Sequence, residues 1–194
     1  MPKKTTPTST LSNPVLFTEE TLRRAADLAT NSYSFRPVWA GGSGEESTGE
    51  SVARHLEATA ALLDTDGWVR IYSTSVLGDN AVPEFDETAT TEDMVRALLD
   101  LVRDEPASGS PRPLSMALRH VAEGEHGDPD TCEIAGGILT LIIRAHTGSD
   151  TATATAWSER LHRTHADITA LLTAGAAFAR AYGPGAAALD VAAA

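Results

Sequence analysis

Two histidines and two arginines lie close together in the stretch WSERLHRTHAD near the C-terminal end of the chain. His162 and His165 are three residues apart, and Arg160 and Arg163 flank them. Paired imidazoles can hold a metal ion, and paired guanidinium groups can hold a phosphate or a carboxylate. The chemistry open to this cluster depends on whether its members share one face of a helix.

The residues that follow predict where a helix starts. Thr164, with Asp167 three residues later, matches a capping box, so we expect a helix to begin at His165. Apolar side chains then recur from Ile168 to Tyr182 at helical spacing. His162 therefore precedes the helix, and the two imidazoles lack the i, i+4 spacing of a helical metal pair. We predict no metal site here.

Two interpretations of the cluster remain open. In the first, the histidines are exposed residues of a turn. In the second, the positive end of the helix dipole and the nearby cations hold an anion such as a phosphate, a carboxylate or an acidic partner. The candidate ligand-binding residues under that hypothesis are Arg160, His162, Arg163, Thr164 and His165.

Other reactive side chains are scattered along the sequence. His55 and His120 lie on separate predicted helices, and an acidic loop from Glu123 to Asp130 contains His126 but lacks the pattern of a calcium loop. The glycine-rich segment 40–49 does not match a phosphate-binding loop. We predict no catalytic residues and no cofactor. The alternative is an enzyme whose site gathers distant residues such as His55, His120 and the acidic loop, which a buried cluster with displaced pKa values would support.

Charge and length exclude several classes of protein. The chain has 194 residues and a net charge of −12, and residues 44–133 carry six basic and twenty acidic side chains. Such an acidic segment opposes binding to duplex nucleic acid, which requires basic groups to neutralise phosphates. No apolar run reaches the ~20 residues of a membrane span, and the N-terminus lacks the apolar part of a secretion signal. We expect a cytoplasmic protein without membrane contact.

Hydrophobic periodicity and helix-start signals predict an all-α bundle of about five to seven helices, with one possible β-hairpin near residues 68–77. The expected core segments are 52–63, 94–102, 114–121, 134–142 and 168–182, with Met94 and Val95 in the buried stripe of one helix. Gly136 and Gly137 are expected to allow close packing of another helix. We expect one domain over 15–183 with a flexible joint at 40–49, a disordered tail at 1–14 and an alanine-rich tail at 184–194.

Three segments resemble a family of small, uncharacterised actinobacterial proteins that also occurs in phages and plasmids. They are ATAALLDTDGW, which ends in a Gly-Trp pair at Trp68; the alanine-rich PLSMALRHVA; and Trp157-Ser158-Glu159 followed by Arg163-Thr164 and a long helix. The family has Trp-Asn-Asp where this chain has Trp-Ser-Glu, and Ser115 lies nearest to the place of a family cysteine. The resemblance implies a small helical domain with Trp68 and Trp157 as core anchors, and it implies no activity.

The sequence therefore favours a non-enzymatic interaction or regulatory protein that acts through contacts with a protein partner or with further copies of itself. Thirteen arginines against two lysines, with abundant alanine, are typical of a bacterial genome rich in G and C, and a mobile element is a possible source. The alternatives are an anion- or ligand-binding protein that uses the helix start at Thr164, and the enzyme described above.

Overall fold

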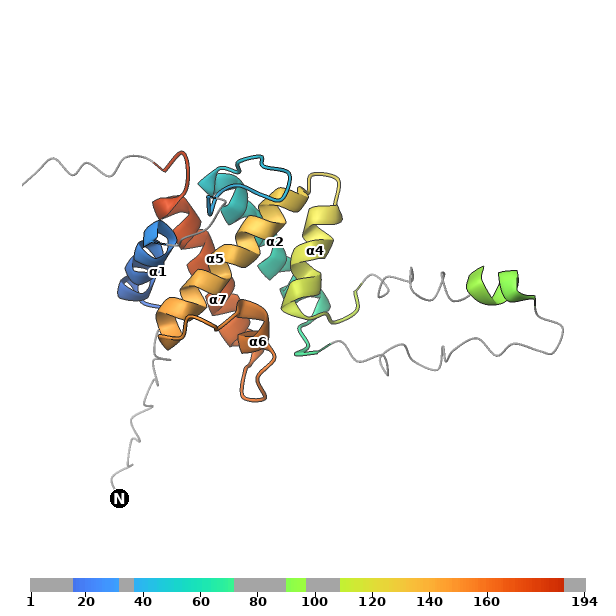
Figure 1. Cartoon of the computed structure of the whole chain (residues 1–194). Coiled ribbons are helices and arrows are strands. Elements are labelled where there is room, and N and C mark those ends of the chain that lie inside the picture. The colour runs from blue at the N-terminus through green and yellow to red at the C-terminus, as the bar shows by residue number, and fades with distance from the viewer. Residues whose placement is uncertain (1–15, 32–36, 72–89, 97–108, 187–194) are drawn as a thin grey trace, which may run out of the picture.

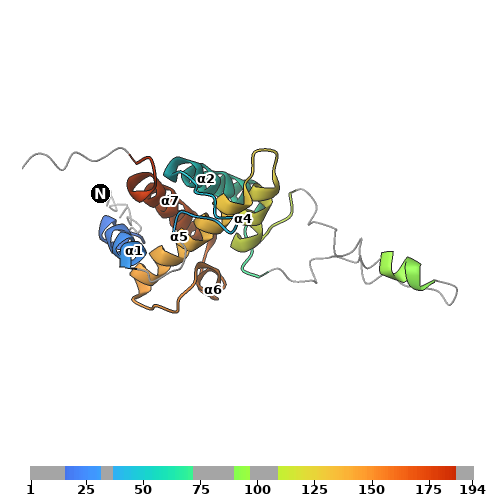
Figure 2. The same ribbon diagram turned by 45° about the horizontal axis from the view of Figure 1, so that its top comes forward.

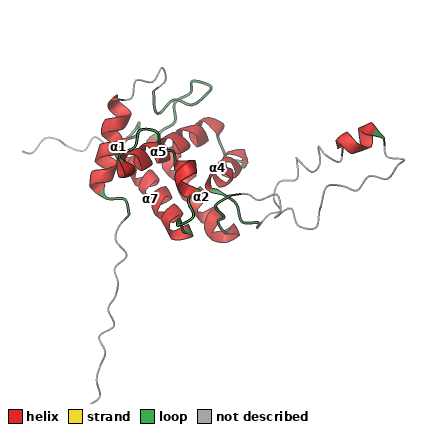
Figure 3. Cartoon of the chain, turned by 60° about the horizontal axis from the view of Figure 1, so that its bottom comes forward, coloured by secondary structure: helices red, strands yellow, loops and turns green. Residues whose placement is uncertain are grey.

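The computed structural model describes residues 16–31, 37–71, 90–96 and 109–186. Within these ranges the chain is mostly helical and contains no sheet, only two isolated β-bridges, so the predicted all-α class is confirmed. Figure 3 shows helices joined by loops in this part of the chain. None of the helices in these ranges has both the length and the apolar character that crossing a membrane would require.

Four of the expected core segments each lie within one helix of the structure. The labelled helices are α1 (Glu19–Asn31), α2 (Gly49–Asp66), α4 (Leu114–Glu123), α5 (Pro129–Thr147), α6 (Ala154–Ser158) and α7 (His165–Tyr182). A further helical stretch covers residues 91–96.

Helix α5 lies at the centre of the bundle. It packs between α1 on one side and α4 on the other, while α2 lies along α7 beneath it (Figure 1). Figure 2 shows α2 and α7 side by side from a second direction. The core is formed by apolar residues that α5 shares with its neighbours, among them Leu56, Leu63, Leu114, Leu118, Ile138, Leu139, Ile142, Ile143, Ile168, Leu171 and Phe178. Four of the five predicted core segments therefore contribute to it.

Side-chain caps start α5 and α7, and the start of α7 is the predicted one. Asp128 accepts hydrogen bonds from the backbone amides of Asp130 and Thr131, and Pro129 occupies the first turn of α5, where no amide hydrogen is needed. Thr164 and Asp167 form the predicted capping box at the start of α7. These local signals fix the ends of the long helices before any tertiary contact is considered.

The expectation for the glycine pair of α5 is wrong. A Cβ atom added at Gly136 or Gly137 would meet nothing within 4 Å, so neither position is a close approach to another helix. The close approach occurs at Gly175 of α7, where a Cβ would lie 2.7 Å from Leu139 Cδ2 and 2.9 Å from Leu56 Cδ1. Periodicity placed the pair on the correct helix but did not show which part of its surface the neighbouring helices cover.

A second close approach joins the start of α2 to the end of α7. A Cβ at Gly49 would lie 2.2 Å from the carbonyl oxygen of Ala179 and 3.0 Å from Gly183 Cα. The amide of Gly49 also donates to the carbonyl of Pro184 at 2.9 Å. Only glycine fits at this crossing without moving the backbone.

The prediction that the helix after Thr90 has a buried apolar stripe is also wrong for the residues that the structure describes there, 90–96. The capping box between Thr90 and Asp93 is present, but Val95 is 50% exposed and Met94 is only partly buried. The remaining residues of that segment, 97–102, lie outside the described residues. Periodicity alone does not show whether the apolar side of a short helix meets the core.

The residues just before segment 72–108 are bonded to Arg112, which follows it. We call this contact the clasp; it is formed by Asp66, Gly67, Trp68, Val69 and Arg112. Trp68 forms a parallel β-bridge with Arg112, in which Arg112 N donates to Gly67 O at 3.2 Å and Val69 N donates to Arg112 O at 3.3 Å. The Arg112 side chain is 2% exposed, and its Nη2 lies 3.0 Å from Asp66 Oδ2. Residues 72–77 of the predicted hairpin lie outside the described residues.

The glycine-rich segment before α2 contacts the start of α5. The amide of Ser43 donates to Asp130 Oδ1 at 3.0 Å, and the hydroxyl groups of Ser47 and Thr131 lie 2.8 Å apart in a buried hydrogen bond. Ala40 pairs with Glu46 in an antiparallel bridge. The segment therefore forms a turn that connects the starts of α2 and α5.

Replacing Gly49 by alanine should lower the free energy of unfolding by about 1–3 kcal/mol, because the added methyl group overlaps backbone atoms of α7. The matched control is Gly137→Ala, which should raise it by about 0.5–1 kcal/mol, since alanine favours a helix and the position is open. Chemical denaturation measures both values. Equal effects of the two substitutions would contradict the close approach at Gly49.

Replacing Asp66 by alanine should lower the free energy of unfolding by about 3–5 kcal/mol, because it leaves the Arg112 guanidinium buried without its carboxylate. Asp64→Ala, in the same turn of α2 but exposed, should change it by less than about 1 kcal/mol. Thermal unfolding of both variants gives the comparison. A mild effect of Asp66→Ala would show that the clasp does not depend on this ion pair.

Candidate functional site

The structure places the predicted site residues in the turn between α6 and α7. Arg163 lies over the ring of Trp157, with its guanidinium carbon 3.9 Å from the ring centroid. Trp157 is 1% exposed and packs against Phe17, whose ring centroid lies 5.0 Å from that of His146. Burial lowers the pKa of Arg163, and it lowers the pKa of His146 together with the nearby charge of Arg163. Arg163 thus extends an aromatic cluster at one end of the bundle.

The other members of the predicted site point to different partners. Thr164 is occupied by the capping box, so the Asp167 carboxylate already lies at the positive end of α7. His165 Nε2 lies 3.3 Å from Asp64 Oδ1 on α2. Arg160 and His162 are exposed in the turn. The two imidazoles thus have different surroundings, and no group of three or more metal-ligating side chains occurs among the residues with described positions.

Large apolar side chains are exposed beside this turn. Leu161 is 84% exposed and Ile71 is 64% exposed. Both line a hollow of about 480 Å³ together with Trp68, Val69, Arg70, Glu159 and Arg163. The Arg70 guanidinium donates to the Leu161 carbonyl oxygen at 2.5 Å, which ties the two segments together. We call these seven residues the Leu161 surface.

A larger pocket of about 720 Å³ lies between α2, the end of α4 and the start of α5. His55 lines it and is only 6% exposed. Burial lowers the pKa of His55, while a backbone hydrogen bond to Leu118 and the charge of Asp128 act in the opposite direction. Asp128 lines the same pocket, and its hydrogen bonds to Thr131 lower the pKa of its carboxyl group.

This pocket brings together two of the distant groups that sequence analysis named, His55 and the acidic loop. The other named histidine, His120, does not line it, whereas His126 does. His55 falls in the apolar stripe of α2, three residues after Val52 and one before Leu56, and both of those residues are fully buried. The position of His55 in this stripe indicates from the sequence that the histidine is buried. The spacing does not indicate which loop lies next to it.

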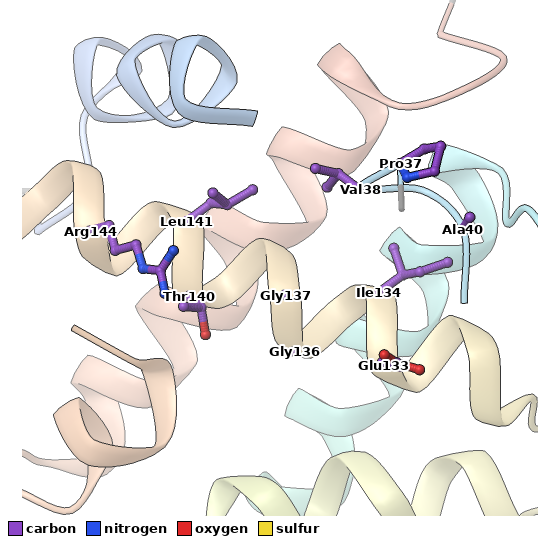
Figure 4. Close-up of a pocket in the computed structure, with 10 residues that line it drawn as sticks. All are labelled: Pro37, Val38, Ala40, Glu133, Ile134, Gly136, Gly137, Thr140, Leu141 and Arg144. Carbon is purple, nitrogen blue, oxygen red and sulfur yellow. The ribbon is translucent and has the colours of Figure 1, made fainter. Parts of the chain in front are cut away.

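A third hollow of about 410 Å³ lies over the glycine pair of α5. Pro37, Val38 and Ala40 form one side of it, and Gly136, Gly137, Thr140 and Arg144 form part of the other (Figure 4). Arg144 Nε donates to the carbonyl oxygen of Ala152, and the Thr140 hydroxyl accepts from the amide of Ala154. The polar side chains here therefore hold the loop that leads to α6.

Comparison with known proteins gives one match. The model of a family of unknown function (DUF6197) matches residues 47–178, which extend from the residues before α2 to the later turns of α7. The matched range includes His55, Asp128, Leu161 and Arg163. No curated protein and no solved structure matches the chain.

Replacing Arg163 by alanine should lower the free energy of unfolding by about 1 kcal/mol, because it removes the cation from the face of Trp157. Arg160→Ala, three residues earlier and exposed, should change it by less than about 0.5 kcal/mol. Urea denaturation followed by circular dichroism measures both. If the two substitutions cost the same, Arg163 does not stabilise the aromatic cluster.

Proposed function

Since the chain belongs to DUF6197, a family of unknown function, we propose a function from the geometry of its surface: it is a non-enzymatic interaction or regulatory protein that binds another protein through the Leu161 surface. The observation that carries the proposal is the exposure of Leu161 and Ile71 beside one hollow. Contiguous exposed apolar side chains on a folded domain are typical of binding surfaces. Polar residues that border such a surface add specificity.

Charge indicates the chemistry of the partner. Arg70 and Arg163 line the hollow and Arg160 is exposed in the same turn, while the nearby carboxylates are those of Glu159 and Asp167. This local excess of cations contrasts with the net charge of −12 of the whole chain. We propose that an apolar side chain of the partner enters the hollow while neighbouring carboxylates of the partner bind the arginines.

The anion-binding hypothesis thereby becomes part of the same proposal. The basic members of the predicted site, Arg160, His162 and Arg163, would bind carboxylates of a protein, while Thr164 and His165 position the turn through Asp167 and Asp64. A cytoplasmic location and a bacterial or phage source belong to the proposal as well. They are supported by the composition and by the resemblance described above.

The proposal predicts that Leu161→Ser combined with Ile71→Ser weakens a complex with a partner protein by at least about tenfold, as expected when central apolar contacts of an interface are lost. The matched control is Tyr182→Ser, which removes another exposed large apolar side chain at the far end of α7. Affinity purification from the native host, followed by mass measurement of the intact complex, gives the partner. Titration of the purified partner then gives the affinities.

Two results would contradict the proposal. One is a complex that survives the double substitution as well as it survives Tyr182→Ser. The other is an unmodified chain that remains monomeric and retains no protein partner. A complex of the chain with itself that the double substitution dissociates would support the proposal, with a second copy as the partner.

A further inference from the structure

His55, which lines the pocket between α2 and the start of α5, has a buried hydrogen-bond acceptor that no described neighbour uses. The Nε2 atom of His55 is buried and has no hydrogen-bond partner within the described part of the chain. The backbone hydrogen bond to Leu118 therefore involves the other ring nitrogen, which acts as its donor. In the neutral imidazole this leaves Nε2 with a lone pair.

An unsatisfied buried acceptor is costly, about 1–3 kcal/mol. The nearby hydroxyl groups do not satisfy it, because Ser47 bonds Thr131 and Thr48 bonds Ser51, each pair at 2.8 Å. The free energy of the site therefore falls if a donor enters the pocket and reaches His55.

The charges around the pocket favour a positively charged donor. The lining carboxylates are Glu46 and Asp128, while the lining cation Arg54 is paired with Glu50 at 2.9 Å. The Asp128 carboxylate accepts from the amides of Asp130 and Thr131 and from the Thr131 hydroxyl, and a carboxylate can accept about four hydrogen bonds. It therefore remains charged and retains acceptor capacity.

The geometry also limits the size of the donor. Nε2 has almost no accessible surface, so a donor must be small, and the side chains over the nitrogen must move slightly to admit it. A primary ammonium group on a short chain meets this requirement, and it has three N–H donors with which to bond the surrounding oxygens.

We propose that this pocket binds a small primary amine, whose ammonium group donates to Nε2 of His55 in the field of the Asp128 carboxylate. The site is separate from the Leu161 surface and shares no residue with it. It gives the protein a small-molecule ligand in addition to the proposed protein partner.

Nuclear magnetic resonance of the histidine side chains in the full chain tests this proposal. Ethylamine is the probe, and ethanol and inorganic phosphate are the matched neutral and anionic probes. At about pH 8 an unperturbed imidazole, with a pKa near 6.5, is neutral and ethylamine is charged. The His55 signals should shift and saturate with ethylamine and should remain nearly constant with ethanol and phosphate. The signals of exposed His162 should not move with ethylamine.

Substitutions connect the shift to the pocket. His55→Leu should abolish saturable ethylamine binding. Because a core substitution can impair folding, Asp128→Asn is the second variant: asparagine also caps helices well, so α5 keeps its start while the charge is removed. It should weaken ethylamine binding by roughly tenfold. Asp130→Asn, at a neighbouring carboxylate that bonds Ser43 and does not line the pocket, should have a much smaller effect.

Three results would overturn the proposal. An absence of saturable shifts with ethylamine would show a pocket that holds water only. Equal shifts with phosphate would identify an anion site. Equal losses in Asp128→Asn and Asp130→Asn would mean that the Asp128 carboxylate does not select the ligand.

Discussion

Burial of α5 is the constraint on which the other helices depend. Ile138, Leu139, Ile142 and Ile143 of this helix are completely buried, and burying each of these side chains contributes about 1.5–3 kcal/mol. No single neighbour can cover apolar residues that point in several directions from one helix. Helices α1, α2, α4 and α7 therefore surround it. The loops between them lie at the ends of the bundle, where the His55 pocket and the Leu161 surface are found, while the third hollow lies over the middle of α5.

The ends of the bundle differ in chemistry because different parts of α5 meet different helices there. At its start, the acidic cap of α5 meets the polar beginning of α2, and this contact encloses hydroxyl groups and a buried histidine. At its end, His146 meets Phe17 and, through it, Trp157. One end thus combines oxygen atoms with negative charge, and the other combines aromatic rings with positive charge.

Local signals predicted most of the helices, and tertiary contacts determined what could not be predicted. Thr164 with Asp167, and Asp128 with Pro129, fix helix starts through bonds within a few residues, so the sequence alone revealed them. The family resemblance agrees at the level of a family of unknown function over residues 47–178.

The roles of Gly136 and Val95 could not be predicted, because each depends on whether a distant segment covers that part of the helix. That His55 and Asp128 line the same pocket depends in the same way on how α2 crosses α5. Exposure of Leu161 beside Ile71 joins segments about ninety residues apart, and no local pattern indicated it.

The clasp has a consequence for how this fold can change in length. Since Trp68 and Arg112 are paired, the residues that directly precede and follow segment 72–108 lie side by side. The entropy cost of closing a loop grows only with the logarithm of its length, about 0.6 kcal/mol for each doubling. As long as the clasp holds these two residues together, a longer or shorter segment between them therefore changes the loop-closure entropy only slightly, so added sequence has a low entropic cost there.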